Sequence, residues 1–183
     1  MKKLIAAVMA MIMMLCVGAV AFAETNETAY ALDPQQHLSW ENITSAEGIA
    51  PVLEQGQFNN LDKYGLKMWI PGSMKAVESD VYAYEYANAD GSLHFMVREE
   101  ERPENLNTNE ALFEHLKGTA DGGAVYPSTI NDMFCLVFSK DNASVIVFPG
   151  EGKVVSFVFT NMTDTNASSF NKVMMASLQK ADK

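Results

Sequence analysis

The chain opens with a long uncharged stretch, and alternating patterns begin only after it. After Lys2 and Lys3 no charged residue occurs until Glu24, and small residues close the stretch as Ala21-Phe22-Ala23. A basic start, an apolar middle and an A-x-A end are typical of a secretory signal peptide. We therefore expect residues 1–23 to be a leader that is cleaved after Ala23. The alternative is an uncleaved membrane anchor, because ~20 apolar residues are enough to span a bilayer.

Strand patterns dominate the middle and the end of the chain. Residues 66–70 form an apolar run that stops at a Pro-Gly pair, and residues 81–86 and 93–98 flank an Asp-Gly turn, which is a strong hairpin signal. Three further apolar runs follow at residues 134–138, 145–148 and 154–159. Short polar connections separate these runs, so the pattern predicts an antiparallel meander.

Apolar residues at helical spacing predict three helices. The first covers residues 40–53, although Pro51 interrupts it. The second follows Asn107 or Thr108 as its N-cap and ends at Gly118. The third runs from about residue 166 to residue 179. The inward positions are Leu112, Phe113 and Leu116 in the second helix, and Phe170, Val173, Met174, Ser177 and Leu178 in the third.

Together these elements predict an α+β fold. We expect a single antiparallel sheet of about six or seven strands, flanked by two or three helices, because hairpin-length connections argue against a parallel βαβ arrangement. Residues 24–37 are polar and lack periodicity, so they are expected to form a flexible lead-in. Residues 38–180 then make one domain, which is long enough for a hydrophobic core.

Charge and cysteine content narrow the range of partners. The chain carries a net charge of −10, and loss of the two leader lysines leaves −12. Such an excess repels phosphate backbones and anionic lipid surfaces, so we expect no nucleic-acid partner and, after signal cleavage, no membrane. Cleavage leaves Cys135 as the single cysteine, in an apolar strand-like run. It cannot form an internal disulfide, and we expect it to be buried.

Several segments of the domain carry a resemblance to a known fold. They are residues 57–71, the Tyr-rich hairpin, Ile130-Asn131 before a strand, residues 154–160 and residues 174–178. These segments resemble uncharacterised small exported bacterial proteins with a PsbP-like fold, in which an antiparallel sheet lies between helices. PsbP itself is an auxiliary protein of photosystem II. The resemblance implies a fold but no catalytic residue, since its motifs are structural.

Candidate chemistry is sparse. The histidines, His37, His94 and His115, are scattered, and none stands in a Gly-x-Ser-x-Gly context. Ser169 to Lys172 matches S-x-x-K without its companion motifs and is better explained as the first turn of a helix. The run of Glu99 to Glu101 with Glu104 is either a weak Ca²⁺ site or, as we prefer, a solvated charge run. We expect no catalytic residue, no metal site and no cofactor.

Aromatic residues supply the one candidate binding surface. Tyr82, Tyr84 and Tyr86 alternate along an expected strand and should therefore share one face, with Trp69 nearby in the sequence. Aromatic side chains are favoured at binding patches, so we take these four as a speculative binding site. The interpretation that we prefer is that the rings pack beneath a helix, because tyrosine is also a good strand former.

The functional hypothesis that follows is an exported, non-catalytic binding or accessory protein of the bacterial envelope or secretome. Its partner is an unknown protein or small molecule, and its oligomeric state stays open. The alternative is a secreted hydrolase of cell-wall or nutrient polymers, with a site that forms only in the fold. A pocket that joins a carboxylate to His94 or His115 would favour the enzyme.

Overall fold

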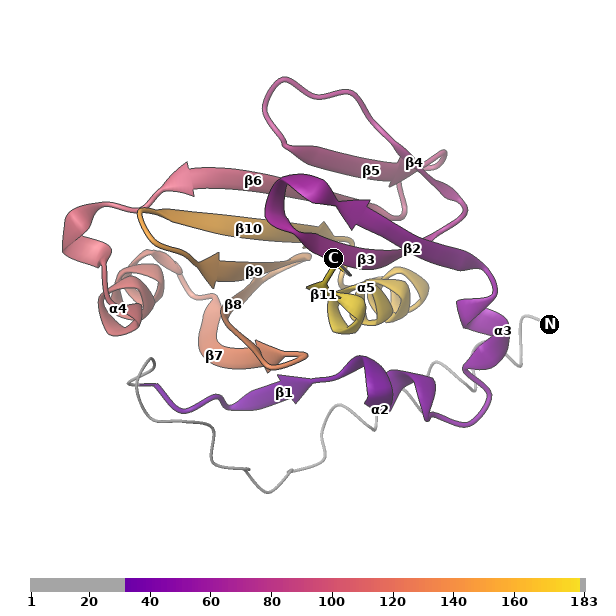
Figure 1. The fold of residues 1–183 in the computed structure, drawn as a ribbon, viewed down its shortest axis with the longest axis horizontal. Helices are drawn as coiled ribbons and strands as arrows, with labels where there is room; N and C mark the ends of the chain where they lie inside the picture. The colour runs from indigo at the N-terminus through magenta and orange to yellow at the C-terminus, as the bar shows by residue number, and fades with distance from the viewer. Residues whose placement is uncertain (1–31, 182–183) are drawn as a thin grey trace.

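The computed structural model describes residues 32–181. The expected leader and the first part of the expected lead-in lie outside the described residues. An eight-stranded mixed sheet forms the centre of the molecule, in the order β1-β7-β8-β9-β10-β6-β5-β4 (Figure 1). Its strands are β1 (Gln36–Leu38), β4 (Met74–Ala76), β5 (Tyr84–Asn88), β6 (His94–Glu101), β7 (Ala124–Ile130), β8 (Met133–Lys140), β9 (Ala143–Pro149) and β10 (Lys153–Thr160).

The pairing within this sheet is antiparallel except at one edge. Strands β7 to β10 follow one another through hairpins, and β10 pairs with β6. The meander expected for residues 134–159 and the hairpin around Asp90-Gly91 are therefore confirmed. At the far edge, β1 runs parallel to β7, with Gln36 opposite Ser128.

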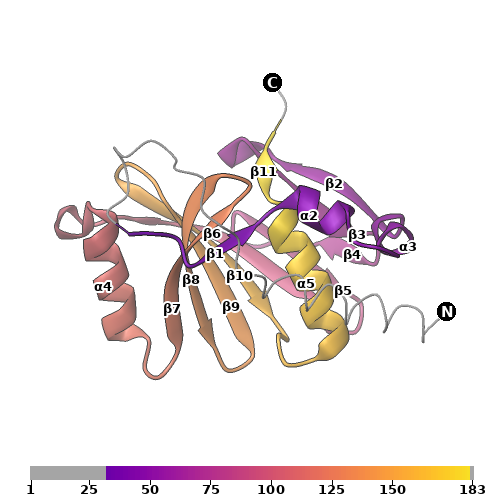
Figure 2. The ribbon, with the colours of Figure 1, turned by 90° about the horizontal axis from the view of Figure 1, so that it is seen from below.

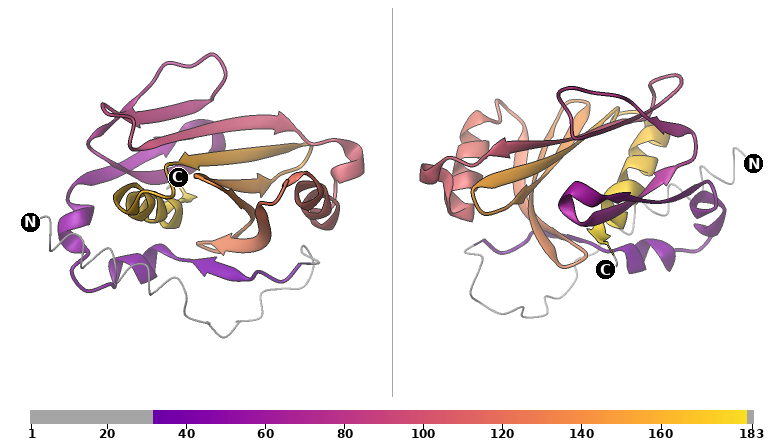
Figure 3. Two further views of the ribbon diagram at one scale, coloured as in Figure 1. Left: turned by 180° about the vertical axis from the view of Figure 1, so that it is seen from behind. Right: turned by 45° about the horizontal axis from the view of Figure 1, so that its top comes forward.

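A second, three-stranded antiparallel sheet packs beside the first (Figure 3). It consists of β2 (Gly56–Leu61), β3 (Leu66–Pro71) and β11 (Gln179–Lys180), with β3 in the centre and β2 at one edge. The backbone N–H of Trp69 in β3 donates to Ser177 Oγ at 2.9 Å, which ties this sheet to the last helix.

Four α-helices and two 3₁₀ turns complete the described part of the chain. They are α2 (Trp40–Thr44), α3 (Ala50–Leu53), α4 (Asn109–Thr119), α5 (Thr165–Ser177), η1 (Asp62–Tyr64) and η2 (Glu104–Leu106). Side-chain caps begin the two longer helices. Thr108 Oγ1 accepts from Ala111 N, and Asp164 Oδ1 accepts from Ala167 N at 2.8 Å. Between residues 32 and 181, no helix is long and apolar enough to cross a membrane.

The large sheet separates two hydrophobic clusters, and Figure 2 shows its strands between α4 and α5. Successive side chains of a strand point to opposite faces, which divides each strand between the clusters. Phe157 and Phe159 of β10 pack with Val173 and Met174 of α5 on the inner face. The smaller cluster on the outer face centres on Leu112 of α4 and also contains Phe134, Leu136, Val147 and Val154.

The expected sheet architecture needs correction. The sequence predicted one antiparallel sheet of six or seven strands, whereas the structure has an eight-stranded mixed sheet and a separate three-stranded sheet. The strand at residues 66–70 leaves the large sheet because it pairs with β2, whose Gly-Gln-Phe-Asn-Asn-Leu sequence shows no strand pattern. Strand β7 was missed because Pro127, Ser128 and Thr129 interrupt its apolar positions.

Several element ends also differ from expectation. The first expected helix is two short helices, because Gly48 adopts φ +78° in the connection between them. Helix α4 continues through Gly118 to Thr119. The end of the expected lead-in is ordered, since Gln36 and His37 belong to β1. Gln179, expected in the last helix, pairs with Lys67 in the small sheet.

Candidate functional site

The β5–β6 hairpin is held by a dense set of turn contacts. Asn88 N donates to Leu93 O at 3.0 Å, and Asn88 Oδ1 accepts from Leu93 N. Asp90 Oδ1 accepts from Ser92 N, and hydrogen bonds from Ser92 lower the pKa of the Asp90 carboxyl group. Gly91 adopts φ +70°, a conformation that favours glycine. The turn therefore fixes the register of the two strands.

This register places the tyrosines and the polar residues of the hairpin on opposite sides. Tyr84 lies opposite Val97 and Tyr86 lies opposite Phe95, and both partners are fully buried on the inner face. Glu85 lies opposite Met96, so its side chain points outward. The outer side of the hairpin is therefore the polar one.

Tyr84 and Tyr86 make packing contacts rather than a free aromatic surface. The Tyr86 ring stacks on Phe95 with the centroids 5.1 Å apart. Tyr84 meets Tyr64 of η1 edge-on at 6.0 Å, and its hydroxyl accepts from Lys63 N at 3.0 Å. Burial raises the pKa of both Tyr64 and Tyr86. These rings join the small sheet to the large one.

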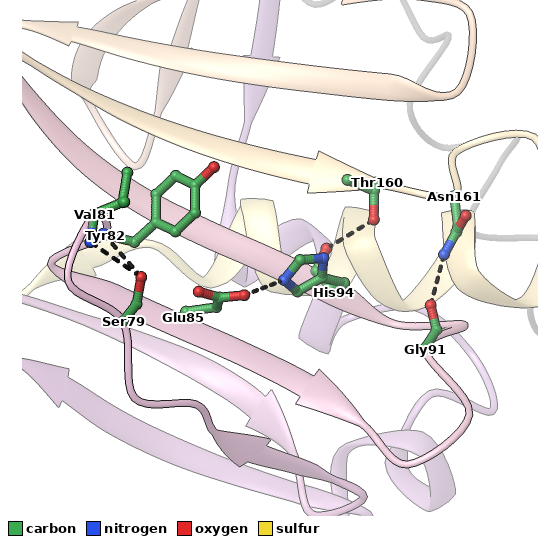
Figure 4. Close-up of polar contacts among 8 residues, drawn as sticks. All are labelled: Ser79, Val81, Tyr82, Glu85, Gly91, His94, Thr160 and Asn161. Carbon is green, nitrogen blue, oxygen red and sulfur yellow. Dashed lines mark hydrogen bonds and ion pairs between the residues drawn. The ribbon is translucent and has the colours of Figure 1, made fainter.

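The other two members of the expected aromatic site lie elsewhere. Trp69 is only 2% exposed, stacks on Phe170 and donates from Nε1 to Leu53 O. Trp69 therefore belongs to the core and shares no surface with the tyrosines. Tyr82 precedes β5. Figure 4 shows its ring on the same side of the hairpin as Glu85 and His94. The expected shared face breaks down because regular alternation begins only at Tyr84.

A carboxylate–imidazole pair stands on the outer side of the hairpin (Figure 4). His94 Nε2 lies 2.8 Å from Glu85 Oε1, with side-chain exposures of 28% and 17%. Thr160 Oγ1 donates to the His94 carbonyl at 3.3 Å, which links β6 to the end of β10. Asn161, at φ +59°, donates to Gly91 O at 2.9 Å. The imidazole is oriented by a carboxylate, an arrangement that general-base catalysis also uses.

The same pair lacks the other parts of a hydrolytic site. Nucleophilic catalysis needs a hydroxyl or thiol within hydrogen-bonding reach of the imidazole. Within the described part of the chain, the His94 side chain hydrogen-bonds to Glu85 and to no hydroxyl or thiol. Neither residue of the pair lines the cleft that residues 102–107 and 149–152 form. The sequence alone does not pair His94 with Glu85, because only the register of the hairpin brings them together.

A protruding loop joins β4 to β5 beside this pair. Ser79 Oγ accepts from the backbone N–H groups of Val81 and Tyr82 at 3.3 and 3.1 Å, which fixes the loop (Figure 4). Val81 is 75% exposed and Val77 is 42% exposed. Glu78 and Asp80 alternate with them, so the loop presents apolar and acidic side chains together. The sequence did not predict this exposure, because residues 81–83 were expected to begin the strand that starts only at Tyr84.

A shallow cleft of about 430 Å³ lies at the other end of the hairpin's second strand. Its lining includes Arg102, Glu104, Asn107 and residues 149–152. Arg102 donates from Nε to Leu106 O at 2.6 Å and from Nη1 to Gly150 O at 3.2 Å. The guanidinium thus fastens η2 to the β9–β10 turn. These hydrogen bonds of Arg102 give the cleft a structural role at a corner of the large sheet.

Other residues singled out in the sequence have structural surroundings. Cys135 is fully buried, and burial raises the pKa of its thiol to about 12. Ser169 is buried and donates to Thr165 O at 2.8 Å. Glu99 Oε2 lies 3.3 Å from Lys153 Nζ and 3.8 Å from Lys63 Nζ. Among residues 32–181, no three His, Cys, Asp or Glu side chains gather as metal ligands.

Comparison with known proteins gives limited likeness. No protein-family model and no curated protein matches the chain. Among solved structures, it is similar to the cyanobacterial PsbP (CyanoP) of Synechocystis, with a TM-score of 0.48 and 14% identity over 69% of this chain and 92% of that one. It is also similar to a Bacteroides thetaiotaomicron protein, with a TM-score of 0.48 and 12% identity over 70% of this chain. The match covers 50% of that protein.

A third similar structure is the yeast Ran-binding protein Mog1p, with a TM-score of 0.41 and 9% identity over 69% of this chain and 96% of that one. A PsbP is thus among the structures that this α+β chain is similar to. With every score below 0.5, neither a site nor a function is transferred from these proteins.

Proposed function

We propose that this chain is an exported, non-catalytic binding or accessory protein of the bacterial envelope or secretome. The observation that carries the proposal is the 75% exposure of Val81 in a loop fixed by two hydrogen bonds. A loop held in one conformation, with two valines and two acidic side chains exposed beside one another, offers apolar and charged contacts that a partner can cover. The binding surface is the loop of residues 77–83 together with the outward Glu85–His94 pair.

The partner that fits this surface is a protein with an apolar pocket and a basic rim. Val77 and Val81 supply the apolar anchors, and Glu78 and Asp80 supply negative charges beside them. The net charge of −10 gives long-range attraction to a basic partner and repels other acidic surfaces. Binding should therefore weaken as salt rises, because charges on an exposed loop are screened.

A photoreactive residue at position 81 tests this assignment in cells that export the protein. A discrete covalent adduct is expected from position 81. The matched control is position 117, whose side chain is 62% exposed. It belongs to α4, which lies at the opposite end of the large sheet from the β4–β5 loop (Figure 1). Val81→Asp should abolish binding of the purified adduct partner. Equal labelling from positions 81 and 117, or none from either, would contradict the proposed surface.

A secreted hydrolase of cell-wall or nutrient polymers is the second candidate. The Glu85–His94 pair supports it, since a carboxylate can orient a histidine base. Assays of the exported protein on peptidoglycan and polysaccharides, with His94→Gln as comparison, separate the two functions. Turnover that His94→Gln abolishes, with folding intact, would replace the binding proposal by the enzyme.

Export and release are part of the same proposal. The basic start and the Ala21-Phe22-Ala23 end of the leader support cleavage after Ala23. Intact-mass measurement of the exported protein should give Glu24 as the first residue. Retention of Met1 in membrane fractions would instead favour the uncleaved anchor.

A further inference from the structure

Strand β2 is an open edge of the small sheet. It pairs with β3 on one side, and no described strand pairs with its other side. Gly72 N donates to Gln55 O at 2.8 Å, so Gln55 and Gly72 form a hydrogen-bonded pair. Such pairs recur at every second position of an antiparallel ladder, which makes Gln57, Asn59 and Leu61 the residues of β2 that bond to β3. The N–H of Trp69, which lies opposite Phe58, points away from β2 and donates to Ser177 Oγ. Phe58 and Trp69 are therefore a pair without hydrogen bonds between them. The backbone groups of Gly56, Phe58 and Asn60 therefore point to the open side.

This edge lacks the features that usually prevent strand addition. Natural edge strands are protected by charged residues, proline or bulges. Strand β2 reads Gly-Gln-Phe-Asn-Asn-Leu, with neither charge nor proline, in a chain of strongly negative net charge. Phe58 is 38% exposed at its centre, and its ring meets Trp40 edge-on at 5.2 Å. Strand β2 itself adds no negative charge to the contact, and Lys67 Nζ of β3 lies 5.5 Å from the centre of the Phe58 ring, so the edge is the least acidic approach that two copies of this acidic chain can use.

The outward groups are also self-complementary. They belong to Gly56, Phe58 and Asn60, which are evenly spaced about Phe58. In an antiparallel pairing of two copies, Phe58 lies opposite its counterpart and Gly56 lies opposite Asn60 of the other copy, and each pair exchanges two hydrogen bonds. Such a two-fold interface is isologous and closes, so it ends at a dimer.

We propose that β2 pairs with β2 of a second copy, which joins the two small sheets into one continuous antiparallel sheet. The interface uses none of the residues of the loop of residues 77–83. Because the two copies repel each other through their net charge, dimerisation strengthens as salt screens that charge. This salt response is opposite to the one expected for the basic partner of the loop.

Engineered cysteines test the register on the exported protein, whose native Cys135 is fully buried. Phe58→Cys places two thiols on directly opposed residues, with Cα atoms about 5.5 Å apart and within disulfide range. Asn60→Cys is the matched control, because its own counterpart lies about four residues further along the ladder, roughly 13 Å away. Mild oxidation should give a covalent dimer from Phe58→Cys and none from Asn60→Cys.

A proline variant tests the backbone contribution by sedimentation velocity. Asn60→Pro removes an outward N–H and no bond to β3, whereas Asn60→Ala keeps that N–H. The dimer should be lost in Asn60→Pro and kept in Asn60→Ala, with circular dichroism reporting the fold of both. If Asn60→Pro fails to fold, Phe58→Lys, which sets two like charges face to face, should give the monomer instead.

Two results would overturn the proposal. One is a wild-type protein that stays monomeric at high concentration in both low and high salt, with no disulfide from Phe58→Cys. The other is a monomer whose β2 edge crosslinks to an extended segment of a different protein. In that case the edge binds a strand, but the strand is not its own copy.

Discussion

His94 Nε2 lies 2.8 Å from Glu85 Oε1 on the outer side of the β5–β6 hairpin, while the tyrosines on either side of Glu85 point inward. One residue step along β5 thus separates a solvent-facing polar pair from a packed aromatic layer. The alternation that builds a strand accounts for both. The polar pair contributes to the proposed binding surface, and the aromatic layer contributes to stability.

A double-mutant cycle should measure how much the pair stabilises the fold. We expect Glu85→Gln and His94→Gln to couple by about 0.2–1 kcal/mol in urea denaturation, because both side chains are partly solvated. Glu114→Gln with Lys117→Gln is the control. That pair is 3.8 Å apart and more than 60% exposed, and its coupling should fall within error of zero. A larger coupling for the control would contradict the role of partial burial.

The three hairpin tyrosines should differ in their effect on stability. Tyr86→Ala loses the stacking on Phe95, and Tyr84→Ala loses the contacts with Tyr64 and Lys63. Each is expected to cost about 2 kcal/mol, below the roughly 3–5 kcal/mol of a fully buried aromatic. Tyr82→Ala should cost less than either in thermal melts. Equal losses at all three positions would restore the single shared face that the sequence predicted.

The sequence predicted the strands with apolar runs and missed those without them. Strands β8, β9 and β10 were predicted because consecutive apolar residues fill both clusters. Strand β2 was missed because it lies at the edge of its sheet and is exposed on both faces at its centre, so polar Gln57, Asn59 and Asn60 suit it. Trp69 was misplaced for a related reason. The residues next to Trp69 in the sequence do not indicate the second sheet in which it is buried.

The candidate site was less accessible to sequence reasoning than the fold. Glu85 and His94 are nine positions apart, and only the hairpin register brings them together. The exposure of Val81 depends on Ser79, which turns the chain before β5 begins. An isolated Ser in a stretch with strand-like alternation gives no signal of such a turn. Contacts of this kind need the folded backbone.

Two glycines should respond in opposite directions to alanine. A Cβ at Gly56 would lie 2.5 Å from both Ile70 O and the Trp69 ring, so Gly56→Ala must displace backbone or a buried indole. We expect a loss of about 1–3 kcal/mol. Gly118 lies inside α4 with nothing near its missing Cβ, and Gly118→Ala should stabilise by about 0.5–1 kcal/mol. A neutral Gly56→Ala would show that the Trp69 ring is loosely held.

Cys135 should make the stability of the protein fall with rising pH above about 9. Burial raises the pKa of its thiol from 9.0 to about 12, so between these values the unfolded chain binds fewer protons than the folded one. Stability contributed by the neutral thiol is complete below pH 9 and is lost as pH rises toward 12, by up to roughly 1.4 kcal/mol per pH unit. Half-buried Tyr126, whose pKa is also raised by burial, acts in the same direction. Cys135→Ala removes the thiol term and keeps the tyrosines, so urea denaturation from pH 8 to pH 10.5 should show a shallower decline in the variant. A parallel decline in both proteins, or rapid labelling of the native thiol at pH 8, would show that Cys135 is not held in a closed core.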